Sequence, residues 1–378
     1  MNYRIPFNKP HFTSREAYHV SAAISLGKIS GNGVMTQKCH SFFEKKYHFR
    51  KALLTSSCTD ALEMAAILCD IQPGDEVIIP SFTFVSTANA FVLRGAKIVF
   101  ADSMGDHPNI DASLLESLIT PRTKAIIPVH YAGIACDMDV IMQIGEKHGI
   151  LVIEDAAHAI DSYYRKKALG SIGQMATFSF HETKNITSGE GGLFVVNDSR
   201  FIGRSEIIWE KGTNRAAFYR GEVDKYGWVD IGSSFLPSDL TAAFLYGQIE
   251  MLGEIQRKRK EIHSRYLSRL SGLEQQAKLS LPTCPDYATQ NGHLFYILTS
   301  GLDERDQLIR YLGKNGIQAV FHYLPLHSSS FYSNRHDGRE LSNADRYART
   351  LIRLPFFYDL TENEIDEVSD LIHQFYKS

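Results

Sequence analysis

Short apolar runs alternate with segments of helical spacing along the first two thirds of the chain. The apolar runs have the length of buried strands and lie at 51–55, 74–80, 96–102, 123–130, 150–153, 176–180 and 193–196. Between most of them, apolar residues recur every three or four positions, at 14–27, 36–47, 61–69, 86–95, 111–119 and 137–148. This alternation predicts an α/β fold with a mostly parallel sheet covered by helices on both faces.

The last third of the chain follows a different pattern. A helical pattern extends from 234 to about 273, and its charged stretch 256–265 predicts an exposed face. Strands are then expected at 293–299 and 317–321, and helices at 305–314, 343–353 and 361–377. We therefore predict a large α/β domain at 1–250, which begins with an extended arm, and a small α+β domain at 251–378.

Composition excludes several classes of protein. The formal net charge is −3 with both signs dispersed, so there is no electrostatic footprint for nucleic acid or an anionic membrane. The five cysteines are odd in number and form no CxxC pair, which argues against a disulfide framework or a structural zinc site. No apolar run approaches the ~18 residues of a membrane span, and the N-terminus is polar. A cytoplasmic protein is expected.

The first candidate site is a strand that leads small hydroxyl residues into a helix. Thr55 ends an apolar run, and Ser57, Cys58 and Thr59 precede a helical segment. Free backbone N–H groups at a helix N-terminus bind anions, and the helix dipole adds to the attraction. The stretch is neither a Walker A loop nor a GxGxxG fingerprint, and an ordinary Ser/Thr helix cap remains an alternative.

An acid and an amine follow two further apolar runs. Asp155 comes just after 150–153 and Lys184 comes after 176–180, so both are expected at strand ends, where ligands bind in α/β sheets. Alternatives stay open: Asp155 as a helix cap, Lys184 as a surface lysine, and His158 as a packed histidine. No sensible ligand spacing supports a metal site.

Phe84 and Ser179 add an aromatic ring and a hydroxyl to the candidate site residues. Phe84 follows the strand 74–80, and a ring at a strand end can stack on a flat cofactor or simply join the core. Ser179 alternates with Phe178 and Phe180 and so faces away from them. An anion cradle, a ring, an acid and an amine are the parts that a pyridoxal phosphate (PLP) enzyme needs.

Over nearly its whole length the chain resembles the sugar-nucleotide aminotransferases of the DegT/DnrJ/EryC1/StrS family. The residues that carry the resemblance include Phe42–Glu44, Ser57–Leu62, Pro73–Val77, Pro80–Phe84, Pro128–His130, Glu154–His158, Phe178–Asn185 and Gly189–Gly192. The resemblance implies a fold-type I PLP-dependent aminotransferase with a seven-stranded-type sheet. It also implies a homodimer with composite active sites, L-glutamate as amino donor and a dTDP-linked 4-keto-6-deoxyhexose as acceptor, in surface polysaccharide synthesis.

The resemblance also implies roles for individual residues. Lys184 matches the lysine that carries the cofactor, and Asp155 matches the acid at the pyridine nitrogen. His158 stands at the ring where the family often has Gln, and Ser234 stands where many members have a phosphate-binding Asn from the partner subunit. The remaining expected contacts are the phosphate ligands Cys58 (backbone), Thr59 and Ser179, the stacking ring Phe84, and the substrate residues Lys211, Arg215, His322, Tyr323 and His327.

Three alternatives to this function remain at the sequence level. A sibling enzyme that aminates C3, or that gives the gluco C4 amine, would carry the same Lys184 and Asp155. In a related sugar 3-dehydratase, histidine replaces the lysine, and Lys184 argues against it. A non-enzymatic regulator with the same fold would bind the cofactor without turnover.

Overall fold

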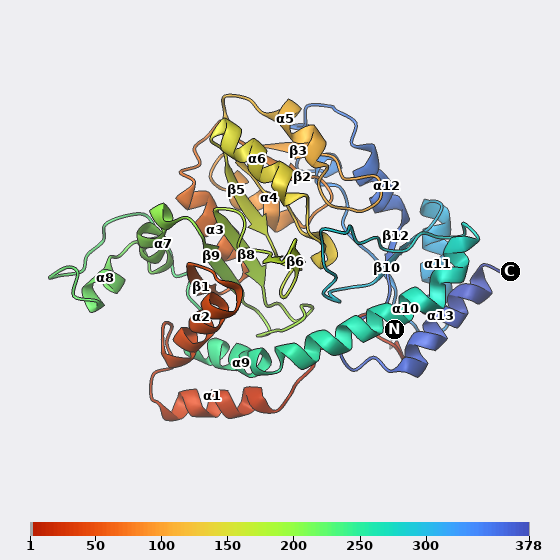
Figure 1. The fold of residues 1–378 in the computed structure, drawn as a ribbon, viewed down its shortest axis with the longest axis horizontal. Coiled ribbons are helices and arrows are strands. Elements are labelled where there is room, and N and C mark those ends of the chain that lie inside the picture. Colours follow the sequence, from red (N-terminus) through yellow and green to blue (C-terminus); the bar gives the residue numbers. More distant parts are fainter. Residues whose placement is uncertain (1–2, 378) are drawn as a thin grey trace.

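A seven-stranded sheet in the order β1-β9-β8-β5-β4-β2-β3 forms the centre of the protein, in a computed structural model that describes residues 3–377 (Figure 1). Its strands are β1 (Lys51–Thr55), β2 (Glu76–Pro80), β3 (Lys97–Ala101), β4 (Thr123–Ile126), β5 (Leu151–Asp155), β8 (Met175–Ser179) and β9 (Gly192–Val196). Strand β9 runs antiparallel to both of its neighbours, and the other neighbouring pairs are parallel. The predicted mostly parallel sheet is confirmed.

Helices cover both faces of this sheet, as the alternating pattern predicted. Because side chains alternate along a strand, Ile78 faces one layer of helices while Val77 and Ile79 face the other. The first layer contains α2 (Val34–Tyr47), α5 (Leu115–Leu118), α6 (Met138–His148) and α9 (Asp239–Glu250), with α1 (Arg15–Ser25) packed on α9. The second layer contains α3 (Cys58–Leu68), α4 (Val85–Val92) and α7 (Ile202–Trp209).

The C-terminal part has its own sheet and core. Its elements are α10 (Leu252–Gln275), β10 (Tyr296–Leu298), α11 (Leu302–Lys314), β11 (Val320–Phe321), α12 (Ser342–Thr350), β12 (Leu351–Arg353) and α13 (Glu362–Phe375). The three strands form an antiparallel sheet in the order β10-β12-β11. Ile5 joins this core from the other end of the chain, whereas Tyr347 of α12 packs with the second helix layer of the large sheet. The division at 250/251 stays a prediction.

Several predicted boundaries are wrong. The helix expected at 343–353 ends at Thr350, because Leu351–Arg353 pairs with both neighbouring strands as β12. The long helix expected from 234 is two helices that meet at Met251. Helix α3 begins at Cys58 instead of 61, because Ser57 caps it and accepts a hydrogen bond from the backbone of Asp60.

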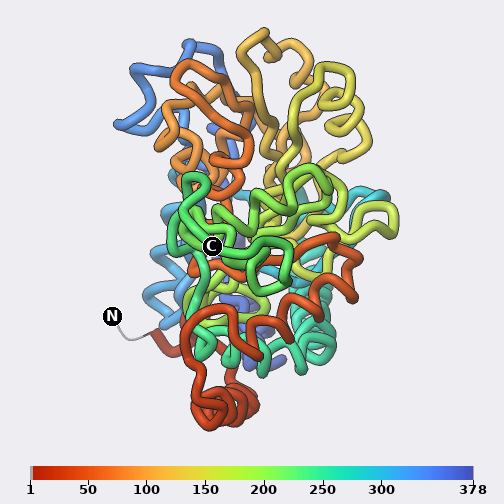
Figure 2. The backbone as a smooth tube through the Cα atoms, turned by 90° about the vertical axis from the view of Figure 1, so that its left-hand side faces the viewer, coloured from red at the N-terminus to blue at the C-terminus, as the bar shows by residue number. Residues whose placement is uncertain are grey.

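Small elements complete the chain. The larger elements are connected by a hairpin, a short helix and four 3₁₀ turns. The hairpin consists of β6 (Tyr163–Tyr164) and β7 (Lys167–Ala168), and the helix is α8 (Arg215–Tyr219). The turns are η1 (Ala112–Leu114), η2 (Tyr131–Gly133), η3 (Ser199–Phe201) and η4 (Leu326–Ser328). Helix α8 belongs to an arm, residues 211–231, that projects from the body (Figure 1). Figure 2 looks onto that side, with the arm in front and α1 at the bottom.

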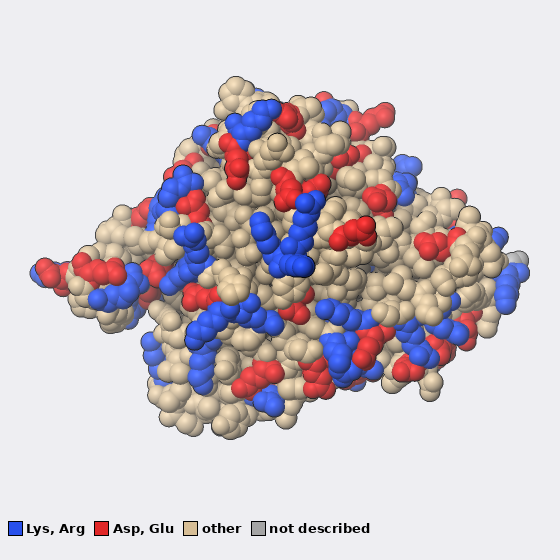
Figure 3. All heavy atoms as spheres, in the orientation of Figure 1, with Lys and Arg blue, Asp and Glu red and all other residues tan. Residues whose placement is uncertain are grey.

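The surface carries mixed charge. Lys and Arg side chains are interspersed with Asp and Glu over the face shown in Figure 3. Across residues 3–377, we find no helix that is both long and apolar enough to cross a membrane.

Candidate active site

A cavity of about 640 Å³ lies at the carboxyl ends of β2, β5 and β8, between the large sheet and the C-terminal segments at 321–323 and 353–356. This is the edge at which α/β folds bind ligands. Nine of the residues predicted from the sequence line it: Cys58, Thr59, Phe84, Asp155, His158, Ser179, Lys184, His322 and Tyr323.

The acid of the site is Asp155, the last residue of β5. It is 4% exposed and accepts hydrogen bonds from Thr87 Oγ1 at 2.8 Å and from the backbone N–H of Ala157 at 3.1 Å. Burial raises the pKa of the Asp155 carboxyl, while these two bonds and the charge of Lys184 oppose the rise. Both bonds come from neutral donors, so within residues 3–377 this buried carboxylate has no cationic hydrogen-bond donor.

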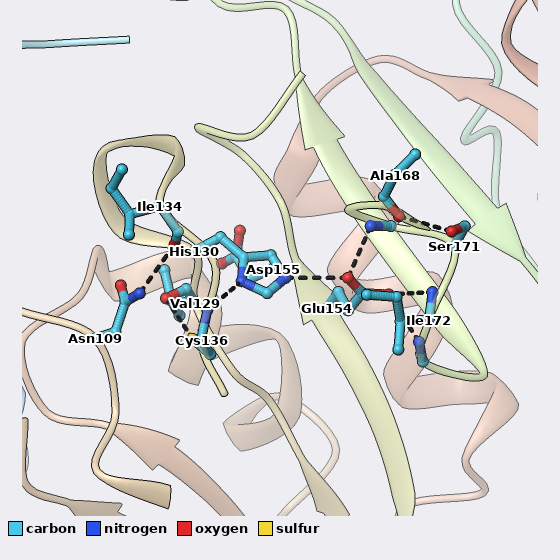
Figure 4. Close-up of polar contacts among 12 residues, drawn as sticks. Asn109, Val129, His130, Ile134, Cys136, Glu154, Asp155, Ala168, Ser171 and Ile172 are labelled. Atoms are coloured by element: carbon cyan, nitrogen blue, oxygen red, sulfur yellow. Dashed lines mark hydrogen bonds and ion pairs between the residues drawn. The ribbon is translucent and has the colours of Figure 1, made fainter. Parts of the chain in front are cut away.

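A buried network holds the end of β5 from behind (Figure 4). Glu154 is fully buried and accepts three hydrogen bonds of 2.7–2.8 Å from backbone N–H groups of the turn 170–173. His130 Nδ1 accepts from the backbone of Cys136, so its Nε2 carries the proton and donates to Glu154 at 3.0 Å. The backbone N–H of His130 in turn donates to the carbonyl of Asp155, which fixes the acid at the strand end.

The amine, Lys184, lies in the loop between β8 and β9. It is partly buried, and burial lowers its pKa to about 8 against the opposing effects of Cys58 and Asp155. Its neighbour Asn185 is anchored by Nδ2, which donates to Gln256 Oε1 at 2.7 Å and to the carbonyl of Asn291 at 3.0 Å. The loop therefore presents a lysine with a depressed pKa, next to an anchored asparagine, to the same cavity as the acid.

The N-terminus of α3 forms an anion cradle. Ser57 caps the helix through the N–H of Asp60, and the N–H groups of Cys58 and Thr59 have no partner within residues 3–377. A Cβ on Gly192 would lie 2.5 Å from the carbonyl carbon and oxygen of Ser57 and 2.6 Å from the Cys58 nitrogen. Only glycine lets β9 approach the cradle this closely.

Ser179 stands beside the cradle. It ends β8 directly opposite Gly192, and it lines the cavity together with Cys58 and Thr59. Thr59 Oγ1 donates to Ser86 Oγ at 2.8 Å and so ties the start of α3 to the start of α4. Hydroxyl and free amide donors at a helix N-terminus suit a phosphate group.

Aromatic rings form the rest of the wall. Phe84 is 56% exposed although it lines the cavity, so a face of its ring is free to stack on a flat ligand. His158 stacks on His293 with ring centroids 4.2 Å apart and lies 6.2 Å from His322. Burial lowers the pKa of all three histidines well below the usual value, so they are neutral at physiological pH.

Four predicted residues lie outside this cavity: Lys211, Arg215, Ser234 and His327. The first three belong to or flank the arm. The predicted roles of Lys211 and Arg215 toward the substrate, and of Ser234 toward the phosphate in the partner's site, stay predictions. The role of His327 as a substrate residue stays a prediction. Its Nδ1 is hydrogen-bonded to Ser81 Oγ at 2.7 Å, which ties the turn η4 to the end of β2.

Several residues that line the cavity were not among the site residues predicted from the sequence, and Thr87, His293 and Arg353 are examples. Thr87 follows Phe84 by one helical turn, a spacing that places both on the same side of α4's first turn. His293 is the first residue of the strand predicted at 293–299, and no flanking signal in the sequence marks it as a site residue. The sequence predicts that Arg353 ends a helix, but its strand pairing in β12 brings it to the cavity.

The residue set fits pyridoxal phosphate. A buried carboxylate that lacks a cationic donor suits a pyridinium N–H, and an amine with a lowered pKa suits covalent attachment. The free ring face of Phe84 and the cradle at Cys58 and Thr59 suit the flat ring and the phosphate. Among the residues that the structure describes, no group of His, Cys, Asp and Glu is arranged to hold a metal ion.

Comparisons with known proteins agree with this chemistry. The sequence profile of the DegT/DnrJ/EryC1/StrS aminotransferase family matches residues 10–373. The spore coat polysaccharide biosynthesis protein SpsC of Bacillus subtilis is 31% identical over 385 aligned residues, which cover 100% of this chain and 98% of SpsC.

Solved structures are similar over nearly the whole chain. Spr1654 of Streptococcus pneumoniae, assigned as a sugar aminotransferase, has a TM-score of 0.91 in its PMP form, with 28% identity over 99% of each chain. An aminotransferase from Psychrobacter cryohalolentis also has a TM-score of 0.91, with 26% identity over 98% of this chain and 99% of its own.

Proposed function

The chain belongs to the DegT/DnrJ/EryC1/StrS aminotransferase family and is a PLP-dependent sugar aminotransferase, and from that premise we propose a specific reaction. The enzyme moves an amino group from L-glutamate to C4 of dTDP-4-dehydro-6-deoxy-D-glucose. The product, dTDP-4-amino-4,6-dideoxy-D-galactose, serves surface polysaccharide synthesis, such as enterobacterial common antigen or an O-antigen. The observation that carries the transaminase assignment is that Lys184 and Asp155 share one cavity with the free amides of α3.

The choice of sugar rests on sequence resemblance. Five segments resemble dTDP-4-amino-4,6-dideoxygalactose transaminases: 56–66, 81–100, 211–215, 224–244 and 319–327. The relative SpsC supports a role in polysaccharide synthesis through its description as a spore coat polysaccharide biosynthesis protein.

The site residues divide the work of holding the cofactor. Lys184 attaches it covalently and Asp155 accepts its pyridine N–H. The amides of Cys58 and Thr59 hold the phosphate with the Ser179 hydroxyl, and Phe84 covers the ring. When bound, the cofactor supplies an electron-poor ring that stabilises negative charge on the carbon bonded to the transferred nitrogen.

Lys184 is the general base and acid of the reaction. Its Nζ takes the proton from Cα of the amino donor, and in the second half-reaction it delivers a proton to C4 of the sugar. A pKa of about 8 leaves part of the amine neutral at physiological pH, so it can accept a proton there. Asp155 stays ionised beside a cationic partner, because an opposite charge lowers a carboxyl pKa.

A second copy of the chain completes the site. The arm exposes large apolar side chains, with Trp228 85%, Tyr219 67% and Tyr226 54% exposed. Contiguous exposed apolar surface marks protein interfaces. In the proposed homodimer this surface is covered, and Ser234 reaches the partner's phosphate while Lys211 and Arg215 reach the diphosphate of its sugar nucleotide.

An NMR spectrum of the product tests this assignment. The enzyme is incubated with L-glutamate and dTDP-4-dehydro-6-deoxy-D-glucose, with Lys184→Ala as the inactive control. We expect the 4-amino-4,6-dideoxygalactose product. A 3-amino or gluco product would overturn the specific reaction and leave the family assignment intact, and absence of any amino sugar would favour a different acceptor or a non-catalytic regulator.

A further inference from the structure

His293 is a buried histidine that contacts two walls of the cavity at once. It is 6% exposed, and its ring stacks on that of His158 with an angle of 21° between the two planes. Its Nδ1 lies 2.8 Å from Oδ1 of Asn185, the neighbour of Lys184 in the chain. The side chain therefore connects the loop that carries the amine with the segment that follows β5.

The hydrogen bonds around Asn185 fix the direction of this contact. Asn185 Nδ2 donates to Gln256 Oε1 at 2.7 Å and to the carbonyl of Asn291 at 3.0 Å. A backbone carbonyl can only accept, so the amide cannot be reversed and its Oδ1 is the acceptor toward His293. His293 is neutral, because burial holds its pKa well below the usual value. Its single ring proton is therefore on Nδ1, and it is donated to Asn185.

A buried arginine holds the main chain of His293. Arg259 of α10 is 3% exposed and donates to the carbonyls of Gly292 and His293, both at 2.7 Å. Burial lowers its pKa to about 9, so it is still charged at physiological pH. Gly292 has a φ of +63°, and a Cβ there would lie 2.7 Å from the carbonyl carbon of Arg259. The buried charge therefore fixes the two carbonyls that flank Cα of His293.

Asn291 ties the other wall to the same segment. Its Nδ2 donates to the carbonyl of His158 at 2.8 Å and to that of Ile160 at 2.9 Å. A buried polar network in which every member is satisfied is rigid and specifies one arrangement. Segment 291–293 thus holds the main chain that follows β5 as well as the loop of Lys184.

We propose that His293 is a positioning residue, which holds Lys184 in place for proton transfer through the hydrogen bond from its Nδ1 to Asn185. This inference rests on the proposed function, because it takes Lys184 as the proton-transfer group. A lysine amine sits on a flexible stem, so its reach depends on where the loop places its Cα. Proton transfer requires the base within hydrogen-bond reach of the reacting carbon's proton, and a small misplacement lowers the rate.

Two substitutions separate the hydrogen bond of His293 from its ring. His293→Phe keeps a ring that can stack on His158 and lacks the donor, whereas His293→Asn lacks the ring and carries an amide N–H in place of Nδ1–H. His263→Phe is the matched control, because His263 is also 6% exposed, packs against the ring of Phe295 and does not line the cavity.

The first readout uses the apoprotein and is the pH profile of the rate at which Lys184 captures pyridoxal phosphate. Burial lowers the pKa of Lys184 to about 8, so a loosened loop that hydrates the amine must raise this pKa. We expect the midpoint of the profile to rise by about 0.5–1 pH unit in His293→Phe. It should stay at the wild-type value in His293→Asn and in His263→Phe.

No other charge near Lys184 changes in these variants. The titratable groups around it are Cys58, Asp155, Arg353, His158 and His322. All of them are retained, and the replaced His293 is itself neutral. A shifted midpoint therefore reports the hydration of the amine.

The second readout is the half-reaction of the holoenzyme with L-glutamate, followed by the absorbance of the bound cofactor. We expect His293→Phe to lower the rate at saturating glutamate about tenfold, the effect of one lost hydrogen bond, and to change the half-saturating concentration less than about twofold. His293→Asn should stay within about threefold of the wild type. In an Asn185→Ala background, His293→Phe should lower the rate by less than about threefold, because its hydrogen bond is already absent.

Three results would overturn the proposal. The midpoint could stay unchanged in His293→Phe while only the melting temperature falls, as for a structural residue. His293→Asn could lose as much rate as His293→Phe, or the full tenfold loss could persist in the Asn185→Ala background. Failure of the proposed function is distinguishable. If the wild type does not react with glutamate but the capture profiles still differ as described, the donor assignment fails and the role of His293 stands.

Discussion

Replacing Gly192 with alanine is predicted to damage the phosphate cradle while sparing the rest of the fold. The added Cβ would lie 2.5 Å from Ser57 backbone atoms and 2.6 Å from the Cys58 nitrogen. Ordinary contact begins at 3.4 Å, so strand or cradle must move by about 0.9 Å. Both obstacles are backbone atoms, so no side-chain rotation relieves the contact.

The expected loss follows from the hydrogen bonds that such a movement breaks. A hydrogen bond between a backbone N–H and a charged phosphate is worth about 1.5–3 kcal/mol. Misplacing one of the two free amides of α3 should therefore weaken cofactor binding by about 10–150-fold. Gly203→Ala is the matched control, because Gly203 lies in α7 and a Cβ there meets nothing within 4 Å.

Titration of the apoprotein with pyridoxal phosphate and with pyridoxal isolates the phosphate contribution. In the wild type the phosphate should add strongly to affinity, and in Gly192→Ala this increment should shrink while pyridoxal binds as before. Gly203→Ala should keep the full increment. If Gly192→Ala bound both compounds like the wild type, the cradle would lie elsewhere.

Three further substitutions or conditions probe the acid and the amine. Asp155→Asn should lower kcat by about 10²–10³-fold in steady-state assays, because the ring loses its ionic partner; a change of less than twofold would contradict that role. Thr87→Val should lower kcat about tenfold, because Asp155 loses its 2.8 Å hydrogen bond, and an unchanged kcat would show that Thr87 is dispensable. The rate at which apoprotein Lys184 captures pyridoxal phosphate should rise about tenfold per pH unit and level off above its pKa of about 8. This follows because only the neutral amine reacts, and a stopped-flow profile that kept rising to pH 10 would contradict the lowered pKa.

The central sheet could be predicted because its strands are buried on both faces. Such strands appear in the sequence as uninterrupted apolar runs, and 51–55 coincides with β1. Asp155 and Lys184 could be found for the same reason, since each is a charged residue next to such a run. The anion cradle could be predicted because Ser57, Cys58 and Thr59 lie between a predicted strand and a predicted helix.

Residues whose position depends on tertiary pairing could not be predicted. Arg353 sits in a short strand that exists because β10 and β11 flank it, and its three residues carry no strand signal against a preceding helix. Thr87 could not be predicted as a site residue, because its hydrogen-bond partner Asp155 lies 68 positions away in sequence. The hydrogen bond between His327 and Ser81 could not be predicted for the same reason, since it joins segments 246 residues apart.

The most direct test of the account is to locate the cofactor on the chain. The holoenzyme is reduced with borohydride and digested, and mass spectrometry identifies the peptide that carries the reduced cofactor. We predict a single modified lysine, Lys184, and no modification in Lys184→Ala. Modification of a different lysine, or an unmodified Lys184 in the loaded enzyme, would contradict the assignment of this cavity as the transamination site.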